Sequence, residues 1–445
     1  MSTDLDERAR AILKANDRGG YTVPTARLYP FQWNWDSALC ALGFATFDMD
    51  RAFREIETLI EGQWDDGMIP HIVFRRPDPD YFPGPEAWGA EGRHPPGVAT
   101  SGISQPPVLA SVLRRLYERS RDAKRIRPLA EACARWHEWW FRARADEIEG
   151  DGDEARVVTV VHPWESGRDN CPDWDAALDN VVVASDLPAY SRRDTSHIDA
   201  EQRPKQEQYD RYMTIVKFGR DHAWEPAAFR ERGPFRVADP GCHFILMRAE
   251  LDLMAMSGAD IPLSSDRIRY RHKRLARGAG ALWNPSVGAW CALDMRAERR
   301  VDGMSSASAL AWWAGAEREA AWWSAKGKPE RGKRMVLGLK RLLEDTRYAI
   351  PSWDPSHQAF DAPRYWRGPV WAVVSFMVSE GLREAGRTDL ADRIRDDARA
   401  LIESAGFYEY FEPLTGRGLG GGDFAWTAAM WLSWCGPNAG SEGDA

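Results

Sequence analysis

Two short segments of the chain combine acidic residues with aromatic and turn-forming residues, and they lie about 240 residues apart. The first runs from Trp164 to Asn170 (WESGRDN) and the second from Tyr408 to Pro413 (YEYFEP). Cleavage of a glycosidic bond needs two carboxyl groups, one to protonate the leaving oxygen and one to activate water or attack the sugar. Any single acid among the 67 in this chain is more often an exposed surface residue. The prediction therefore rests on the aromatic neighbours that both segments share.

Tryptophan is unusually frequent, with 22 residues in a chain of 445. Part of this content is expected in the cores of large helical proteins. Many tryptophans, however, stand beside Gly, Pro, Asp or Glu in segments without helical periodicity. Aromatic rings stack on sugars, and by lowering the local dielectric they separate the pKa values of two neighbouring acids. These tryptophans predict a carbohydrate-binding cleft.

The composition excludes several classes of function. The net charge is −8 and basic residues are interspersed with acidic ones, so no nucleic acid partner is expected. No apolar run approaches the roughly 20 residues of a membrane span, and the polar start of the chain lacks a signal peptide. The six cysteines are scattered without zinc-like spacing, which predicts reduced core thiols in a cytoplasmic protein. Neither a metal site nor a cofactor is expected, and a homo-oligomeric assembly is left open.

Apolar residues recur at spacings of three and four along the whole chain, which is typical of amphipathic helices. Two late segments, Val370–Val378 and Trp426–Trp434, are apolar almost all round and should be buried on every side. Strand signals are few and short, as at Val157–Val161. Helices are predicted near 51–63, 109–116, 124–142, 244–254, 264–278, 305–325, 330–345 and 387–404. The alternation of fully buried and one-sided helices predicts an all-α double ring, with the loops at one end building the site. A solenoid is the competing layout, but we find no repeat of constant period.

No linker rich in Gly, Ser or Pro divides the chain, so a single domain is predicted over residues 1–435. The polar residues 436–445 are predicted to form a disordered tail. Residues 176–210, approximately, form a long, highly charged segment without a clear pattern. Such a segment in a compact domain is usually functional or disordered, and we predict that it folds over the site as a lid.

Ten short motifs, taken together and in order, resemble those of glycoside hydrolase family 63, in its bacterial mannosylglycerate and glucosylglycerate hydrolase branch. The Glu-Ser-Gly-x-Asp element at 165–169 is also shared with the trehalases. The motifs are Tyr29–Asp36, Asp66–Ile72, Tyr81–Pro85, Thr100–Pro107, Trp164–Asn170, Gln202–Pro204, Tyr209–Tyr212, Tyr365–Trp371, Glu409–Gly416 and Trp426–Ala429. The resemblance implies an (α/α)6 barrel, the six-hairpin glycosidase fold. It also implies an inverting α-glycoside hydrolase, which cleaves the α-linked mannosylglycerate, glucosylglycerate or both to the sugar and D-glycerate.

The resemblance also implies roles for individual residues. It places the general acid on Asp169 and the general base on Glu409, while Trp35 and Asp36 would hold the sugar. Tyr81, Gln105 and Arg203 would contact the glycerate, with Arg203 binding its carboxylate through a planar two-point fork. The other substrate-binding residues that it implies are Tyr29, Trp164, Glu165, Tyr365, Trp366, Arg367 and Trp371. The expected partner is a small glycoside that carries a carboxylate.

Three alternatives stay open at this point. A related α-glucosidase acting on short neutral oligosaccharides would leave Arg203 without a ligand carboxylate. A carbohydrate-binding module with a decayed site would not need both candidate acids. A cyclase or epimerase on the same barrel type would use histidines such as His71 and His162 as its acid and base, although these two are expected to be structural.

The chain departs from the family pattern at two places near the expected glycerate end. Glucosylglycerate-specific members carry glutamines just ahead of the Trp-Thr-Ala-Ala motif, where this chain has Asp423-Phe424-Ala425. Arg364 stands where some relatives carry an acid. These departures leave the choice between glucose and mannose undecided.

Overall fold

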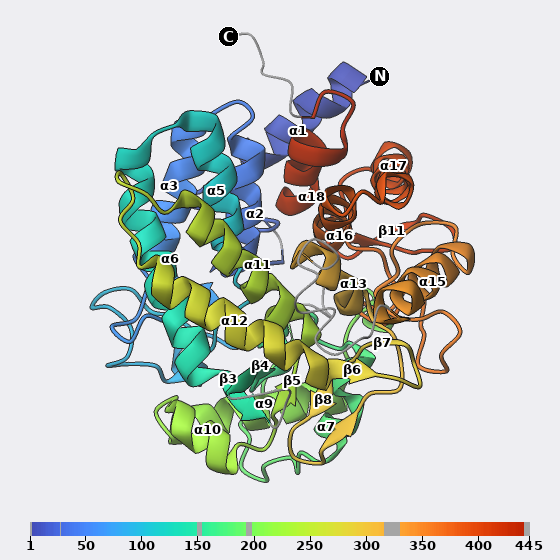
Figure 1. The fold of residues 1–445 in the computed structure, drawn as a ribbon. Helices are drawn as coiled ribbons and strands as arrows, with labels where there is room; N and C mark the ends of the chain where they lie inside the picture. The colour runs from blue at the N-terminus through green and yellow to red at the C-terminus, as the bar shows by residue number, and fades with distance from the viewer. Residues whose placement is uncertain (1, 27, 149–153, 193–197, 316–329, 440–445) are drawn as a thin grey trace.

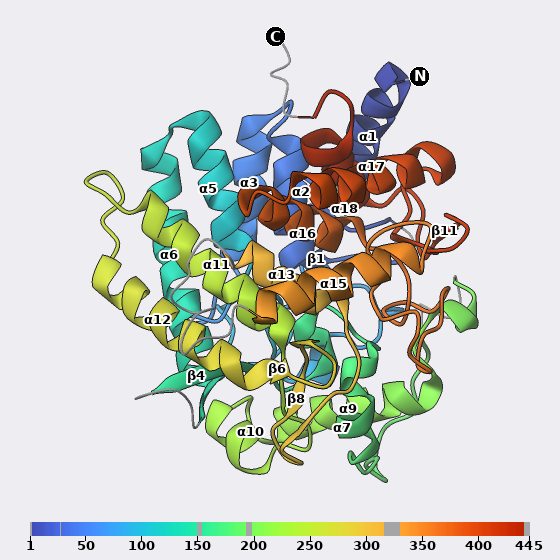
Figure 2. The ribbon, with the colours of Figure 1, turned by 45° about the vertical axis from the view of Figure 1, so that its right-hand side comes forward.

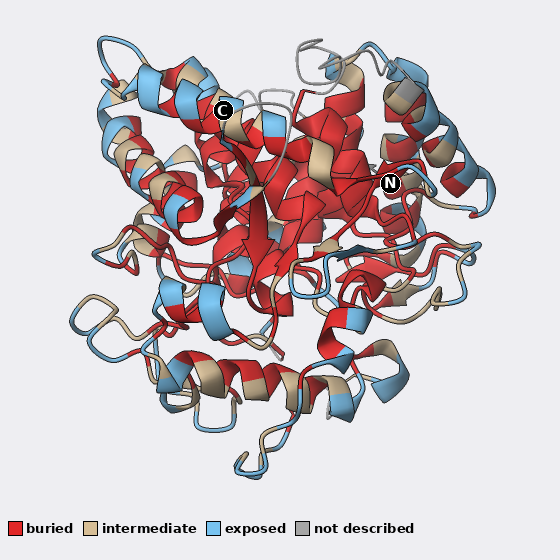
Figure 3. Ribbon diagram, turned by 60° about the horizontal axis from the view of Figure 1, so that its bottom comes forward, coloured by how far each residue is buried: buried red, intermediate tan, exposed pale blue. Residues whose placement is uncertain are grey.

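The computed structural model describes residues 2–26, 28–148, 154–192, 198–315 and 330–439. Within these ranges, six helices contact one another in sequence order and close into a ring. They are α2 (Asn34–Phe44), α5 (Leu109–Ser120), α11 (Pro240–Met256), α13 (Ser306–Trp313), α16 (Ala372–Glu384) and α18 (Ala425–Met430). Every residue of α2, α13 and α18 is buried. This is expected for helices that other helices enclose on all sides. Figure 3 shows this buried centre.

An outer set of helices surrounds the ring (Figures 1 and 2). They are α1 (Ser2–Asn16), α3 (Met49–Ile60), α6 (Ala123–Ala143), α12 (Ser265–Leu282), α15 (Glu330–Glu344) and α17 (Thr388–Ala405). In α3, Asp48 caps the first turn by accepting from the backbone N–H of Arg51, and the buried face is formed by Ala52, Phe53, Glu55, Ile56 and Leu59. The predicted all-α double ring is confirmed, and the fold is an (α/α)6 barrel.

The predicted helices agree with the structure except at two kinds of position. The helix expected over 305–325 ends at Trp313, and residues 316–329 lie outside the described ranges. Helices α1, α2 and α9 (Gln206–Asp221) were not predicted. Charged residues interrupt the apolar periodicity of α1 and α9, and the start of α2 falls within the Tyr29–Asp36 motif. Part of the predicted lid is therefore helical, since α7 (Asp175–Asp179) overlaps its start and α9 begins within it.

A small antiparallel sheet supports the loop that carries the first acidic segment. Its strands, in spatial order, are β3 (Ala145–Ile148), β4 (Ala155–Val160), β5 (Val237–Ala238), β8 (Leu293–Asp294) and β9 (Arg299–Arg300). Strand β4 confirms the strand expected at 157–161, and it leads directly into a 3-10 turn, Pro163–Ser166. The sheet lies toward the end of the molecule opposite α1, as Figures 1 and 2 both show.

Three two-stranded antiparallel sheets complete the strands of the described ranges. They are β1 (Gln32–Trp33) with β2 (Ile72–Val73), β6 (Trp283–Asn284) with β7 (Ala289–Trp290), and β10 (Tyr410–Phe411) with β11 (Gly418–Leu419). Tyr410 pairs with Leu419 across the last hairpin. This pairing fixes the backbone next to Glu409 at the edge of the barrel.

The remaining short elements lie in the loops between the barrel helices. They are α4 (Pro85–Trp88), α10 (Pro226–Arg232), the 3-10 turns Pro172–Trp174 and Ala200–Gln202, and a π-helical turn, Trp431–Cys435. All six cysteines are buried and form no disulfide, as predicted. None of the helices in the described ranges is long and apolar enough to cross a membrane. Of the predicted tail, Asn438 donates a hydrogen bond to Asp6, and residues 440–445 lie outside the described ranges.

Candidate active site

A cavity lies at the N-terminal ends of several inner helices. Its lining includes Trp35 and Asp36 from the start of α2, Trp371 from the start of α16 and Phe424 from the start of α18. The cavity encloses about 920 Å³ of space free of protein atoms, a volume that includes the part open to solvent. Helix N-termini carry partial positive charge, so this end of the barrel favours carboxylates.

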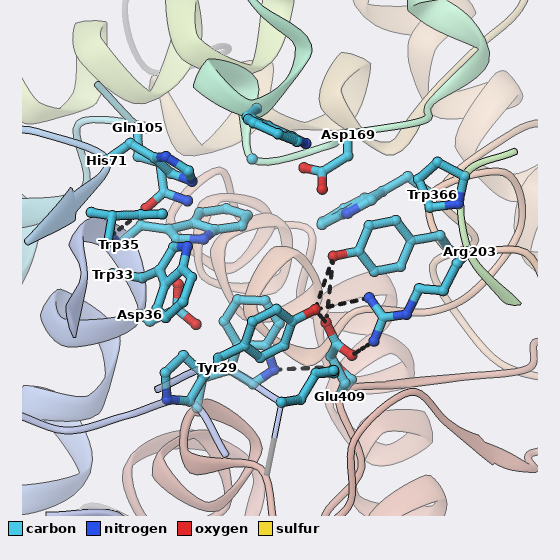
Figure 4. Close-up of a pocket in the computed structure, with 18 of the residues that line it drawn as sticks. Tyr29, Trp33, Trp35, Asp36, His71, Gln105, Asp169, Arg203, Trp366 and Glu409 are labelled. Atoms are coloured by element: carbon cyan, nitrogen blue, oxygen red, sulfur yellow. Dashed lines mark hydrogen bonds and ion pairs between the residues drawn. The ribbon is translucent and has the colours of Figure 1, made fainter. Parts of the chain in front are cut away.

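The structure brings together most of the residues that the sequence predicts for the site. Asp169 and Glu409 extend into the cavity from opposite sides in Figure 4. The predicted residues that line the cavity are Tyr29, Trp35, Asp36, Tyr81, Gln105, Trp164, Asp169, Arg203, Tyr365, Trp366, Trp371 and Glu409. They come from segments far apart in the sequence, so the fold itself assembles this lining.

Asp169 lies on a loop, and the preceding residue, Arg168, anchors this loop to the protein interior. Arg168 is buried and forms ion pairs with Asp173 and Asp239, each with an N–O distance of 2.6 Å. Asp239 in turn caps α11 by accepting from two backbone N–H groups of its first turn. The Tyr212 hydroxyl donates to the backbone carbonyl of Asp169 at 2.8 Å. The carboxyl group of Asp169 is therefore presented by a fixed backbone.

A glycine allows this loop to approach the aromatic wall. Gly167 has a φ of +69°, and a Cβ atom at this position would lie 2.8 Å from the ring of Trp35. Residues with a side chain disfavour this conformation, and the space is already filled. Gly167 thus lets Trp35 pack directly against the loop that carries Asp169.

Glu409 receives donors on both of its carboxylate oxygens. The Arg203 guanidinium lies 2.7 Å from Oε2, and the backbone N–H of Gly421 donates to the same oxygen at 3.3 Å. On the other oxygen, Oε1, the Tyr29 hydroxyl donates at 3.0 Å and the Tyr365 hydroxyl lies at 3.5 Å. The side chains of Arg203 and Glu409 are each only 2% exposed, so this is a buried ion pair.

Asp36 lies in a less favourable environment than Glu409. Burial raises the pKa of the Asp36 carboxyl well above its usual value, and nearby Glu409 and Asp169 raise it further. Both effects disfavour the charged form. Asp36 therefore keeps its proton to a higher pH than an exposed aspartate, which suits it to a hydroxyl-binding role.

Aromatic rings form much of the cavity wall. Trp366 and Trp371 stack with their ring centroids 3.8 Å apart, and Trp35 lies 6.2 Å from Trp366. Trp426 meets Trp35 edge-on at 5.6 Å. This arrangement provides flat apolar faces of the kind that pack against sugar rings.

Two predicted substrate-binding residues do not line the cavity. Glu165 is fully buried behind it and pairs with Arg144 at 2.9 Å. Arg367 pairs with Asp175 at 2.6 Å. Their charged groups are engaged with protein partners that fix the loops, so contact of Glu165 or Arg367 with substrate stays a prediction.

Sequence analysis left out several residues that line the cavity. They are Pro24, Leu28, Trp33, His71, Ile72, Phe82, Pro83, Trp88, Gly167, Pro204, Tyr209, Phe424 and Trp426. Most of them lie within motifs already noted, which was the signal that could have found them; the exceptions are Pro24, Leu28, Trp88 and Phe424. Burial, with a contribution from His162, lowers the pKa of His71 to about 3. The imidazole is therefore neutral at physiological pH.

The two departures from the family pattern lie at different distances from the cavity. Asp423 is exposed and its carboxylate lies 3.5 Å from Arg8, whereas its neighbour Phe424 lines the cavity. Arg364 donates to the backbone carbonyl of Arg203 at 3.1 Å. Arg364 thus contacts the cavity through the backbone of Arg203.

No three His, Cys, Asp or Glu side chains in the described ranges are grouped so that they could hold a metal ion. The carboxyl groups of the cavity can transfer protons or attack a sugar directly. Asp36, Asp169 and Glu409 supply three such groups within one cavity.

Comparisons with known proteins agree with this geometry. The family model for the mannosylglycerate hydrolase MGH1-like glycoside hydrolase domain matches residues 29–427. The mannosylglycerate hydrolase of Thermus thermophilus is 42% identical over 96% of this chain and 99% of its own length. The glucosylglycerate hydrolase of Mycolicibacterium hassiacum is 33% identical over 98% of each chain.

Solved structures give the same result. The crystal structure of the family 63 mannosylglycerate hydrolase from Thermus thermophilus, in complex with Tris and D-glycerate, superposes with a TM-score of 0.86. It is 41% identical, and the match covers 96% of this chain and 98% of that one. The chain is a glycoside hydrolase and belongs to the mannosylglycerate hydrolase MGH1-like family.

Proposed function

We propose that the protein hydrolyses mannosylglycerate, glucosylglycerate or both, releasing the sugar and D-glycerate with inversion at the anomeric carbon. The relatives that bear these names support the substrate class. The observation that carries the proposal is one cavity in which Asp169 and Glu409 extend from opposite sides, with Arg203 beside Glu409 (Figure 4).

In this mechanism Asp169 is the general acid and Glu409 the general base. Asp169 donates its proton to the glycosidic oxygen as the bond from that oxygen to the anomeric carbon breaks. Water attacks the anomeric carbon from the opposite face and gives a proton to Glu409. The products are the free sugar with inverted configuration and glycerate.

The remaining lining residues would bind the two halves of the substrate. Asp36 and Trp35 hold the sugar, the acid through its hydroxyl groups and the indole through its face. Tyr81, Gln105 and Arg203 hold the glycerate. The Gln105 side-chain oxygen accepts from the backbone N–H of Trp35 at 3.2 Å, which leaves its amide N–H groups available for the ligand.

The segment at 176–210 acts as a lid in this proposal. Arg203 and Pro204, near its end, line the cavity. Gln202 connects the segment to the barrel, because its backbone carbonyl accepts from the Tyr410 hydroxyl at 3.0 Å and its side chain accepts from Gly420 at 3.0 Å. Closing the lid excludes water around the reacting bond.

One observation favours a second candidate, an α-glucosidase acting on short neutral oligosaccharides. Arg203 already has a carboxylate partner in Glu409, so it does not need a ligand carboxylate to balance its charge. A substrate panel separates the two candidates. Mannosylglycerate, glucosylglycerate and a neutral α-linked disaccharide are incubated with the protein, and the products are resolved by proton NMR. We expect rapid release of glycerate and slow cleavage of the disaccharide, whereas the reverse order would establish the neutral α-glucosidase.

A further inference from the structure

The ion pair between Arg203 and Glu409 places a guanidinium on the group that has to accept a proton from water. Both side chains are buried, and the Arg203 Nη2 to Glu409 Oε2 distance is 2.7 Å. The other terminal nitrogen, Nη1, donates to the Tyr29 hydroxyl at 2.8 Å, and this hydroxyl donates to Oε1 of Glu409. Figure 4 shows the three side chains joined in this network.

These contacts oppose the work of a general base. A carboxylate has about four lone-pair sites, and Glu409 already meets Arg203, Gly421, Tyr29 and Tyr365. Water must compete with these donors for an oxygen of Glu409. The Arg203 guanidinium also occupies Oε2 with a charge-assisted hydrogen bond, which has to be broken or shared before water can use that oxygen.

Arg203 also has donor capacity that the protein does not use. Its Nε is buried and has no hydrogen-bond partner among the described residues. Nε and Nη2 lie on one edge of the guanidinium, which is the edge that holds a carboxylate in a two-point fork. Among the described residues that line the cavity, Arg203 is the one permanent cation, while Asp36, Asp169 and Glu409 are acids. A ligand carboxylate therefore has a single guanidinium to bind.

We propose that Arg203 restrains Glu409 until the carboxylate of an anionic aglycone binds the guanidinium and releases the base. This inference rests on the proposed function for the identity of the base and for the class of substrate. Two carboxylates, one from the protein and one from the substrate, compete for one guanidinium. Arg203 is then a positioning residue that selects anionic glycosides through the chemical step as well as through binding.

The structure limits the movement that this release requires. The backbone around Arg203 is fixed, because Arg364 donates to its carbonyl at 3.1 Å and Gln202 is bonded to Tyr410 and Gly420. The guanidinium also lies over the Tyr365 ring, 4.6 Å from its centroid. A rotation of the Arg203 side chain, with the segment still docked, is enough to open Oε2 of Glu409.

Restraint of Glu409 by Arg203 also affects the turnover of neutral substrates. If the arginine only bound glycerate, its removal would leave neutral glycosides unaffected. With the ion pair in place, a neutral glycoside meets a restrained base and should turn over slowly even when it is bound. Interactions that act only on the reaction step change kcat, whereas uniform binding changes KM.

The test uses α-mannosyl fluoride and α-glucosyl fluoride as neutral substrates. Fluoride leaves with little help from an acid, so the rate reports on water activation by Glu409. Fluoride is also small, which leaves the glycerate side of the cavity open for an added anion. Hydrolysis is followed with a fluoride electrode in the presence of D-glycerate, with glycerol and sodium chloride as controls for shape and ionic strength.

We expect D-glycerate to raise kcat for the fluorides about tenfold, and glycerol and sodium chloride to leave it unchanged. Arg203→Gln should give a high rate without D-glycerate and no further response, because the restraining charge is gone. Arg203→Lys keeps a charge near Glu409 and should stay slow, which separates loss of restraint from general damage. Lys205→Gln removes a charge from the same segment outside the cavity and should behave like the wild type.

Two outcomes would overturn the inference. One is that D-glycerate inhibits fluoride hydrolysis or leaves it unchanged in the wild type. The other is that Arg203→Gln, shown by circular dichroism to be folded, lowers kcat for the fluorides. Either result, found together with normal hydrolysis of mannosylglycerate, would leave the proposed function intact. Failure to hydrolyse any glycerate glycoside would instead contradict the proposed function.

Discussion

Glu165 and Asp36 are both buried carboxylates, but their surroundings differ in kind. Glu165, behind the cavity wall, pairs with Arg144 and accepts from the backbone N–H groups of Ser104 and Val161. Asp36, in the wall itself, has three other acids nearby (Glu409, Asp169 and Glu55), and burial together with these acids raises its pKa. We call the residues behind the cavity wall, such as Glu165 and Arg144, the supporting layer. Charges in this layer are paired with protein groups, whereas carboxyl groups in the cavity wall can bind a ligand or exchange a proton with it. Such a wall costs stability in return for function.

Glu409 shares features of both regions. It lines the cavity like Asp36, yet it is paired with an arginine like Glu165. In the supporting layer the pairing is permanent, because Arg144 lies outside the cavity lining. Arg203 lines the cavity and can meet a ligand. Glu165 therefore holds loops in place, whereas Glu409 is itself held by Arg203 until substrate binds.

The largest effect should come from the two acids of the cavity wall. Asp169→Asn and Glu409→Gln should each reduce kcat for mannosylglycerate by at least about 10²–10⁴-fold, the usual contribution of general acid–base catalysis. Thermal melting should show that both variants remain folded. Glu412→Gln is the matched control, since Glu412 caps a turn by accepting from Leu414 and Thr415. Near-normal activity of Glu409→Gln, with loss in Glu412→Gln, would move the base to Glu412.

A second prediction concerns the supporting layer. Arg144→Met leaves Glu165 as a buried charge without its arginine, which should cost about 3–5 kcal/mol in the free energy of unfolding. The double variant with Glu165→Leu should recover part of this loss, because no unpaired charge remains. Urea denaturation followed by tryptophan fluorescence measures both values. Equal stability of Arg144→Met and the wild type would show that the two regions do not differ as described.

The smallest predicted effect is on thermal stability. Asp36→Asn should stabilise the protein, whereas Arg144→Met should destabilise it. Because the pKa of Asp36 is raised in the folded protein, folding favours the protonated form, and stability is lost as pH rises from about 3.9 through the raised folded pKa. Asp36→Asn removes this penalty and should raise Tm at pH 7 by roughly 1–3 °C. The gain should shrink toward pH 4, while KM for the glycoside rises.

Melting curves of wild type and Asp36→Asn between pH 4 and 8 check this prediction. A lower Tm for the variant at pH 7 would mean that Asp36 is a satisfied structural acid, like Glu165. A gain in Tm that does not vary with pH would indicate that the variant improves packing and does not act by removing a buried ionisable group.

The sequence predicted the barrel because its inner helices are apolar all round, as in α16 and α18. Aromatic and turn-forming residues also indicated the two acidic segments, and the family resemblance then selected Asp169 and Glu409 within them. The sequence could not distinguish Trp164, which lines the cavity, from its neighbour Glu165, which lies behind it. One residue of a tight turn can face the ligand and the next the core, and motif spacing does not show which.

The partner of Arg203 was likewise invisible in the sequence. Arg203 and Glu409 are 206 residues apart, and no local pattern links them. Their contact depends on the docking of the segment that carries Gln202 against the hairpin β10–β11. Long-range ion pairs of this kind follow from tertiary packing, so they appear only once the fold is known.

The most direct test of the account is the configuration of the first sugar released. Wild-type protein is mixed with mannosylglycerate, and separately with glucosylglycerate, and proton NMR spectra are recorded before the anomers equilibrate. With Asp169 as acid and Glu409 activating water, the β-anomer of the sugar appears first, together with glycerate. Early accumulation of the α-anomer would contradict this account, because it would require a covalent intermediate and a different role for Glu409.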